Sequence, residues 1–118
     1  MTHASQIIGR RGEELAAAFL RTKGFEIIAR NWRCRFGEID LIATRKQEMR
    51  FVEVKTRVTT TFGYPEESVT PNKLLHLQRS IECWLRVHPS LKQYQIDVIA
   101  IAAYAPGPPR VMWIEGVS

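Results

Sequence analysis

Apolar residues recur along the chain with two different periods, and these periods predict where helices and strands form. The first helical pattern covers residues 5–23, and Gly24 follows it as a helix stop. Its apolar stripe contains Ile8, Leu15 and Phe19. The chain is therefore expected to begin with a helix that packs this stripe against the rest of the domain.

A second helix is predicted over residues 71–87. Thr70 suits the N-cap and Pro71 the first helical position, because the missing N–H of proline costs no hydrogen bond there. The apolar residues that keep the helical spacing are Leu74, Leu77, Ile81, Trp84 and Leu85.

Alternating residues and short apolar runs predict five strands. They cover residues 25–32, 38–44, 50–57, 95–103 and 111–116. Residues 58–69 are rich in turn formers and are expected to form a loop. The order αβββαββ indicates an α/β fold in which helices flank a sheet, as a single domain over residues 1–118.

The second and third predicted strands form a hairpin whose sequence, over residues 37–57, is GEIDLIATRKQEMRFVEVKTR. Its centre lies between residues 46 and 47, so the numbers of facing residues sum to 93. This register places Asp40 opposite Glu53, and Glu38 opposite Lys55. The opposite face is then apolar and contains Ile39, Leu41, Val52 and Val54.

The facing carboxylates of Asp40 and Glu53 repel each other unless water screens them, one is protonated or a cation lies between them. Mg²⁺ binds through one or two carboxylates together with waters and a substrate phosphate. With Lys55 on the same face, these groups suit metal-assisted hydrolysis of a phosphodiester. The alternative is a solvated face with a cross-strand ion pair between Glu38 and Lys55. The position of Asp40 favours the metal site over the solvated face, because aspartate forms strands poorly and here faces another acid.

Composition and charge narrow the class of protein. The formal net charge of +5 favours anionic partners, nucleic acid first. The N-terminus lacks the apolar segment of a signal peptide, and no apolar run approaches the roughly 20 residues of a membrane span, so a cytoplasmic protein is expected. Cys34 and Cys83 lack metal-ligand spacing and are interpreted as buried or idle thiols.

Several sequence strings resemble known families. Asp40, followed by Glu53-Val54-Lys55, resembles the D…ExK form of the PD-(D/E)xK nuclease motif, although Ile39 stands where that motif has proline. The strings GRRGEELAAAFLRTKGF, RNWRCRFGEIDLIA, FVEVKTR, FGYPEESVTPNK and IDVIAI resemble the YraN-like family of uncharacterised bacterial proteins over residues 9–101. The resemblance implies a restriction-endonuclease-like fold with a mixed sheet, similar to archaeal Holliday-junction resolvases.

The resemblance also implies roles for four residues. Asp40 and Glu53 become ligands of Mg²⁺ or Mn²⁺, and Lys55 becomes the catalytic lysine. In the resolvases a helical glutamate 11 residues before a Gly-aromatic pair completes the site, and Glu13 stands 11 residues before Gly24-Phe25. Glu13 is thus implied as a further catalytic residue and metal ligand. The alternative for Glu13 is a helix-terminal carboxylate that the helix dipole favours.

Further basic and aromatic residues are candidate contacts to nucleic acid, each with an ordinary surface role as its alternative. The candidate phosphate contacts are Lys73, Arg57, Arg33 and Arg35, and Arg10, Arg11 and Arg30 extend them into a basic rim. Two aromatic residues of the loop suit either stacking on bases or packing over a core edge, and they are Phe62 and Tyr64. The tryptophans Trp32, Trp84 and Trp113 are expected to pack in or beside the core.

The sequence thus predicts a Mg²⁺- or Mn²⁺-dependent endonuclease that acts on DNA, including branched or damaged DNA, without a membrane partner. The resemblance to resolvases implies a homodimer. One alternative is a non-catalytic nucleic-acid-binding module on the same fold, and another is a protein-interaction adaptor. The intact set of Asp40, Glu53 and Lys55 favours the enzyme, since a module that only binds has no need of opposed acids.

Overall fold

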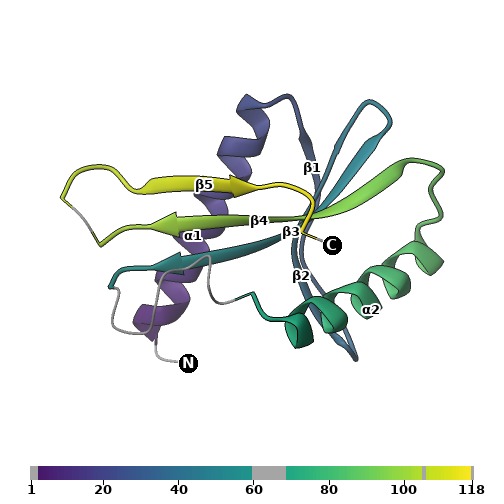
Figure 1. Ribbon diagram of the computed structural model, residues 1–118, viewed down its shortest axis with the longest axis horizontal. Helices are drawn as coiled ribbons and strands as arrows, with labels where there is room; N and C mark the ends of the chain where they lie inside the picture. Colours follow the sequence, from purple (N-terminus) through teal and green to yellow (C-terminus); the bar gives the residue numbers. More distant parts are fainter. Residues whose placement is uncertain (1–2, 60–68, 105, 118) are drawn as a thin grey trace.

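The computed structural model describes residues 3–59, 69–104 and 106–117, and its elements follow the predicted order. They are α1 (His3–Thr22), β1 (Glu26–Cys34), β2 (Gly37–Arg45), β3 (Glu48–Arg57), α2 (Pro71–Val87), β4 (Gln93–Ala102) and β5 (Arg110–Ile114) (Figure 1). The α/β class and the order αβββαββ are therefore confirmed. The predicted ends differ from the observed ones by no more than two residues, and those of α2 are the same.

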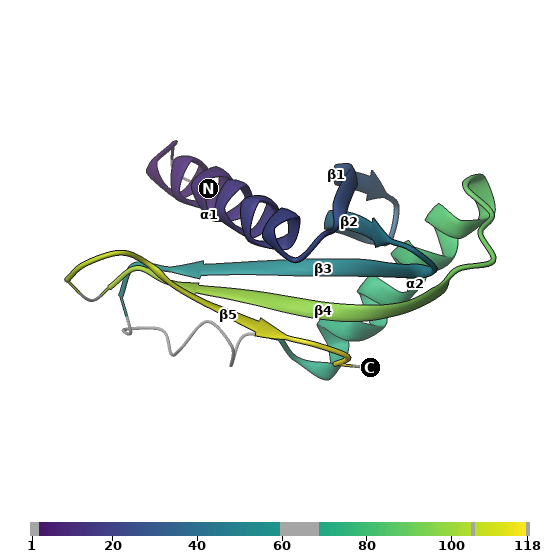
Figure 2. The ribbon, with the colours of Figure 1, turned by 90° about the horizontal axis from the view of Figure 1, so that it is seen from above.

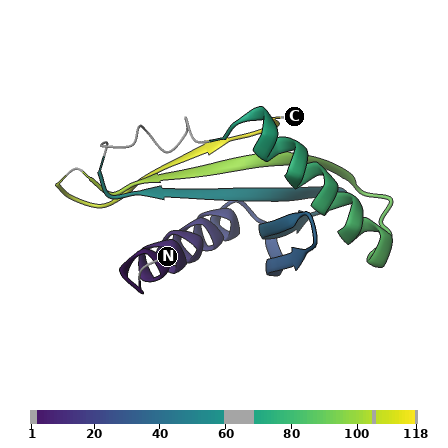
Figure 3. The same ribbon diagram turned by 90° about the horizontal axis from the view of Figure 1, so that it is seen from below.

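The five strands form one sheet in the order β1-β2-β3-β4-β5. Neighbouring strands are antiparallel except β3 and β4, which are parallel, so the sheet is mixed as predicted. The chain covers the distance between these two parallel strands through α2. The two helices lie on opposite faces of the sheet, and β1 and β2 rise out of the plane of the other strands on the side of α1 (Figures 2 and 3).

Helix α1 packs on the sheet through a face of small side chains. Ala16, Ala17 and Leu20 are fully buried, whereas Leu15 is 39% exposed, so the prediction that Leu15 belongs to the buried stripe is wrong. Small residues allow close approach to the strands, and a Cβ added at Gly12 would collide with the hydroxyl of Thr56. The helix ends as predicted, at Gly24, whose φ of +89° suits glycine.

The opposite face carries the second apolar cluster, beneath α2. Leu77, Ile81 and Trp84 are buried there, and the ring of Trp84 meets Phe51 edge-on at 5.7 Å between centroids. Thr70 caps the helix, since its hydroxyl accepts a hydrogen bond from the backbone N of Lys73. No helix in the described ranges is long and apolar enough to cross a membrane.

Strands β2 and β3 pair in the predicted register only over part of their length. Leu41 faces Val52 and Ile42 faces Phe51, as the sum of 93 requires. The observed pairing ends at Leu41. Ile39, two residues earlier, packs in the apolar cluster beneath α2. The prediction that Ile39 shares an apolar face with Leu41 is therefore wrong, because β2 turns away from β3 at this point.

A buried ionic cluster joins β3, β4 and the segment after β5. The carboxylate of Asp97 is 0% exposed and accepts hydrogen bonds from Arg50 at 2.8 Å, from the indole of Trp113 at 2.9 Å and from the backbone N of Gly116 at 3.0 Å. Arg50 also contacts Glu115 at 2.8 Å. Burial lowers the pKa of Arg50, but hydrogen bonds to Glu115 and Asp97 outweigh this effect and raise that pKa overall. These contacts give the buried carboxylate of Asp97 a hydrogen-bond donor from each of three segments.

Replacing Asp97 with alanine is expected to lower the free energy of unfolding by about 3–5 kcal/mol, because the buried guanidinium of Arg50 loses its buried partner. The matched control is Glu115→Ala, since Glu115 contacts the same guanidinium but its side chain is 49% exposed. That control should lose no more than about 1 kcal/mol. Urea unfolding measures both values. Equal losses would contradict the importance of the buried contact.

Candidate functional site

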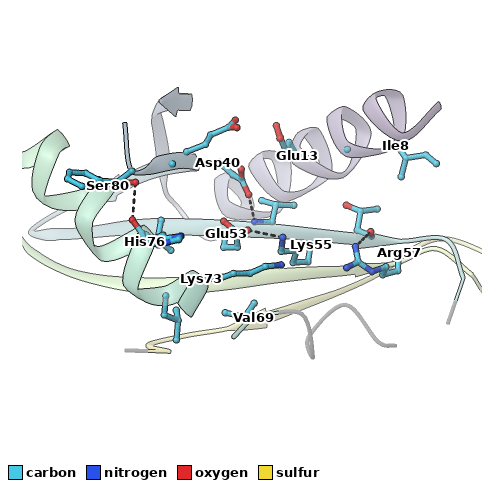
Figure 4. A pocket seen from close by; sticks show the side chains of 18 of the residues that line it. Ile8, Glu13, Asp40, Glu53, Lys55, Arg57, Val69, Lys73, His76 and Ser80 are labelled. Carbon is cyan, nitrogen blue, oxygen red and sulfur yellow. Dashed lines mark hydrogen bonds and ion pairs between the residues drawn. The ribbon is translucent and has the colours of Figure 1, made fainter. Parts of the chain in front are cut away.

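A cavity of about 780 Å³ lies where α1, β3, α2 and the start of β2 converge. Its lining includes all four residues that the resemblance implies, namely Glu13, Asp40, Glu53 and Lys55. Figure 4 shows them together, with Glu13 on α1 above Asp40 and with Glu53 and Lys55 on β3 below. The structure thus brings these residues into one cavity from three separate elements.

Asp40 occupies the point where β2 separates from β3. Its Oδ2 accepts a hydrogen bond of 2.8 Å from the backbone N of Val54. This N–H points toward β2 just beyond the last observed pair, Leu41 with Val52, where no backbone carbonyl of β2 pairs with it. The carboxylate of Asp40 accepts its hydrogen bond instead. The short side chain of aspartate closes the gap that opens between the two strands.

The environment of Asp40 opposes its ionisation. Burial raises its pKa most, and the charge of Glu53 raises it further, so that it reaches about 8. Glu13 and Glu38 act in the same direction, while the hydrogen bond from Val54 lowers the pKa. A carboxyl group held near its neutral form by neighbouring acids is in a site that favours a cation.

Glu53 and Lys55 lie side by side on β3. The Nζ of Lys55 is 3.1 Å from Oε1 of Glu53, and each side chain is 20% exposed. The predicted pairing of Glu38 opposite Lys55 is wrong, because the pairing of β2 with β3 ends at Leu41. The alternative of an ion pair between Glu38 and Lys55 is contradicted as well. Glu38 instead contacts Arg33 across the β1–β2 pair at 3.4 Å. Lys55 therefore stays beside Glu53, within the cavity.

Glu13 approaches the same acids from α1. It is half-buried, whereas its neighbour Glu14 is exposed, as predicted from the helical spacing. Burial raises the pKa of Glu13, and a hydrogen bond with Asn31 lowers it by less. The charges of Glu38 and Glu53 raise this pKa as well. Glu13 thus belongs to the same acidic group, although the helix and the hairpin are distant in sequence.

Helix α2 contributes the opposite wall of the cavity. Lys73, a predicted phosphate contact, lines it, and burial followed by the charge of Lys55 lowers the pKa of Lys73. His76, one helical turn further on, lines the cavity too, and its backbone carbonyl accepts a hydrogen bond from the buried Ser80. The sequence interpretation did not place His76 here, although its spacing of three residues from Lys73 puts both on one helix face.

The remaining basic residues are distributed around the cavity. Arg57 lines it, and its guanidinium donates to the carbonyl of Thr56 at 3.0 Å. Arg33 is 79% exposed beside Glu38, and Arg35 lies over the ring of Phe36. The described residues Arg10, Arg11 and Arg30 are exposed. The two loop aromatics with candidate roles in stacking, Phe62 and Tyr64, lie outside the described residues.

Two sets of residues outside the acidic group agree only in part with expectation. Cys34 and Cys83 are free and half-buried, and each thiol affects the pKa of the other, a proximity that their sequence spacing did not indicate. The tryptophans pack as predicted. Trp84 is buried, while Trp32 and Trp113 pack against opposite apolar clusters.

The donor set of the cavity suits a divalent ion held by few protein ligands. Within the described ranges, no three histidine, cysteine, aspartate or glutamate side chains form a group that would hold a metal ion by themselves. Mg²⁺ requires less than that, since it binds through one or two carboxylates and takes its other ligands from water and phosphate. Asp40 and Glu53 fit this pattern, and the roles of Asp40, Glu53 and Glu13 as metal ligands stay predictions.

The fold and cavity define an α/β domain whose mixed sheet carries acidic and basic side chains at one end. The chain belongs to the uncharacterised protein family UPF0102, whose sequence pattern matches residues 12–101. The predicted membership of an uncharacterised bacterial family is thereby confirmed.

Relatives match nearly the whole chain. A UPF0102 protein of Arthrobacter sp. (strain FB24) is 42% identical over 115 residues, which cover 97% of this chain and 98% of the relative. One from Mycolicibacterium vanbaalenii is 40% identical over 118 residues, covering 99% and 98%. One from Nocardia farcinica is 50% identical over 97 residues, covering 81% and 76%. The similarity therefore includes both helices and the whole sheet.

Replacing Asp40 with asparagine is expected to stabilise the metal-free protein increasingly as the pH rises. The pKa of Asp40 is raised from 3.8 to about 8 in the folded state, so between these values the wild-type fold binds a proton that the unfolded chain has released, and it loses stability with rising pH. An asparagine side chain has no such proton and still offers an oxygen to the N–H of Val54. Each unit of pKa difference corresponds to about 1.4 kcal/mol.

Urea unfolding in the presence of a chelator, repeated at several pH values between 4 and 8, measures this difference. The control is Glu14→Gln, because Glu14 is exposed on α1 and does not line the cavity. The stability of Glu14→Gln should follow wild type at each pH. Parallel curves for Asp40→Asn and wild type would contradict the opposed ionisation of Asp40.

Proposed function

We propose that this protein is a metal-dependent nuclease that hydrolyses phosphodiester bonds of DNA, including branched or damaged DNA. The observation that carries the proposal is the meeting of Asp40, Glu53 and Lys55 in one cavity. A basic protein with a net charge of +5 attracts nucleic acid. The carboxylates gathered in this cavity, however, repel a phosphate. A bound cation resolves that conflict.

Asp40 and Glu53 are the residues that would hold Mg²⁺ or Mn²⁺. The support is electrostatic: the charge of Glu53 is the second-largest cause of the raised pKa of Asp40, and a divalent ion would reverse the effect. When bound, such an ion supplies Lewis-acid polarisation of a phosphoryl oxygen and lowers the pKa of a water. The chain's own part is to present two oxygen donors to one cavity, Asp40 from β2 and Glu53 from β3.

Lys55 and Lys73 supply positive charge from two sides of the cavity. Lys55 is held beside Glu53 at 3.1 Å, and from there its ammonium group contacts the negative charge that develops on the phosphate. The charge of Lys55 lowers the pKa of Lys73, which supports a short separation between the two lysines. We assign Lys55 to the transition state, and Lys73 and Arg57 to binding of the phosphate backbone.

The second candidate is a nucleic-acid-binding module without turnover. It explains the basic surface and the arginines of β1, but it gives no reason for a half-buried Asp40 beside three further acids. A protein-interaction adaptor explains neither feature. The homodimer implied by resolvases stays a prediction, and sedimentation of the free protein and its DNA complex is the direct measurement.

Replacing Lys55 with alanine is expected to reduce cleavage by roughly 10²–10³-fold, the loss typical when a group that stabilises transition-state charge is removed. Cleavage is measured on linear, flapped and four-way DNA with Mg²⁺ and with Mn²⁺. The matched control is Lys92→Ala, because Lys92 lies just before β4, at the opposite end of β3 from Lys55. Stability should change little in either variant, since neither side chain belongs to the apolar core.

Inactivity of wild type on every substrate with both metals would favour the binding module over the nuclease. Cleavage that persists in both Lys55→Ala and Glu53→Gln would contradict the assignment of the site, whichever DNA is cut.

A further inference from the structure

The turn between β1 and β2 carries an aromatic ring surrounded by arginines. Arg35 and Phe36 form this turn, between the paired residues Cys34 and Gly37. The guanidinium carbon of Arg35 lies 4.7 Å from the centroid of the Phe36 ring, and that of Arg79, on α2, lies 5.9 Å away. Two guanidinium groups thus lie within about 6 Å of the centre of one half-buried ring.

The arginines around this turn, namely Arg35, Arg79 and Arg86, have no carboxylate partner among the described residues. The charges of Arg86, on α2, and of Arg35, in the turn, both act on the thiol of Cys83, so both arginines lie near this thiol. Arg33 differs, since it contacts Glu38. An unpaired cluster of this kind suits an anionic partner.

The aromatic turn also adjoins the candidate active site. Phe36 and Gly37 line the same cavity as Asp40 and Lys55. The β1–β2 pair stands out from the plane of the other strands, so its turn projects beside α2 rather than lying flat in the sheet (Figures 2 and 3). The ring of Phe36 therefore lies at the wall of the cavity, with Arg35 and Arg79 beside it.

We propose that Phe36, Arg35 and Arg79 form a stacking site for an unpaired nucleobase, with Arg86 among its phosphate contacts. The inference rests on the proposed function and specifies its substrate: nucleic acid with an unpaired nucleotide next to the phosphate in the cavity. Aromatic rings and guanidinium planes both stack on bases, and stacking tolerates any base because each has a π-face. Bases inside an intact duplex cannot reach the ring, so a duplex gains only phosphate contacts.

The test is the binding preference for forked over fully paired DNA of the same length, with 2-aminopurine at the first unpaired position of the fork. Binding is measured by fluorescence in a Lys55→Ala background with Ca²⁺, so that cleavage does not interfere. Phe36→Leu should reduce the preference for the fork about tenfold, a typical loss for one stacked base. It should also abolish the quenching of 2-aminopurine, and duplex affinity should change much less.

Conservative replacement provides the matched control. Phe36→Trp should restore both quenching and preference, because it keeps an aromatic face, while Arg110→Gln, on β5, removes one charge elsewhere and should leave the preference unchanged. An undiminished preference in Phe36→Leu would overturn the stacking site, even if the protein proves to be a nuclease. A preference that depends on Phe36 would support the stacking site, even if wild type cleaves nothing.

Discussion

The hydrogen bond between the carboxylate of Asp40 and the backbone N of Val54 is the interaction on which the rest of the site depends. It holds β2 and β3 together at the point where their regular pairing ends. Beyond that point β2 turns away, and the opening admits Glu13 from α1 and the first turns of α2 to the same cavity. The side chain of Asp40 spans this gap and is also ionisable, so the same residue bridges the two strands and places a carboxylate in the cavity.

The protein has two buried or half-buried aspartates in contrasting surroundings: Asp97 has several hydrogen-bond donors, whereas Asp40 lies among other acids. Asp97 is more deeply buried than Asp40, yet Arg50, Trp113 and Gly116 all donate to it. That cluster ties β3 and β4 to the segment after β5 and gives the sheet a rigid region. Asp40 has the N–H of Val54 and three neighbouring acids instead. The contrast supports a structural role for Asp97 and agrees with the proposed role of Asp40 in binding a metal.

The sequence predicted the elements and much of the site because its signals were local. Register followed from alternation around the turn, and the end of α1 followed from Gly24. The errors lie where tertiary packing decides. Helical spacing alone could not show that α1 exposes Leu15, and hairpin symmetry could not show that β2 leaves β3 before Glu38.

Local sequence patterns could not predict contacts between elements that are distant in sequence. His76 joins the cavity, and Arg79 joins Phe36, only because α2 crosses the end of the β1–β2 pair. Nothing in the spacing of Cys34 and Cys83 indicated that their thiols meet. The position of Glu13 was expected from the resemblance to resolvases, and its neighbours Asn31 and Glu38 became evident from the fold.

The most direct test of the account is calorimetric titration of Mn²⁺ into wild type, Asp40→Asn, Glu53→Gln and the control Glu14→Gln. The account predicts saturable binding of the ion by wild type and by Glu14→Gln, and affinity at least about tenfold weaker in the other two variants, a loss of about 1.4 kcal/mol. Equal affinity in all four proteins would contradict the central claim that Asp40 and Glu53 hold the metal.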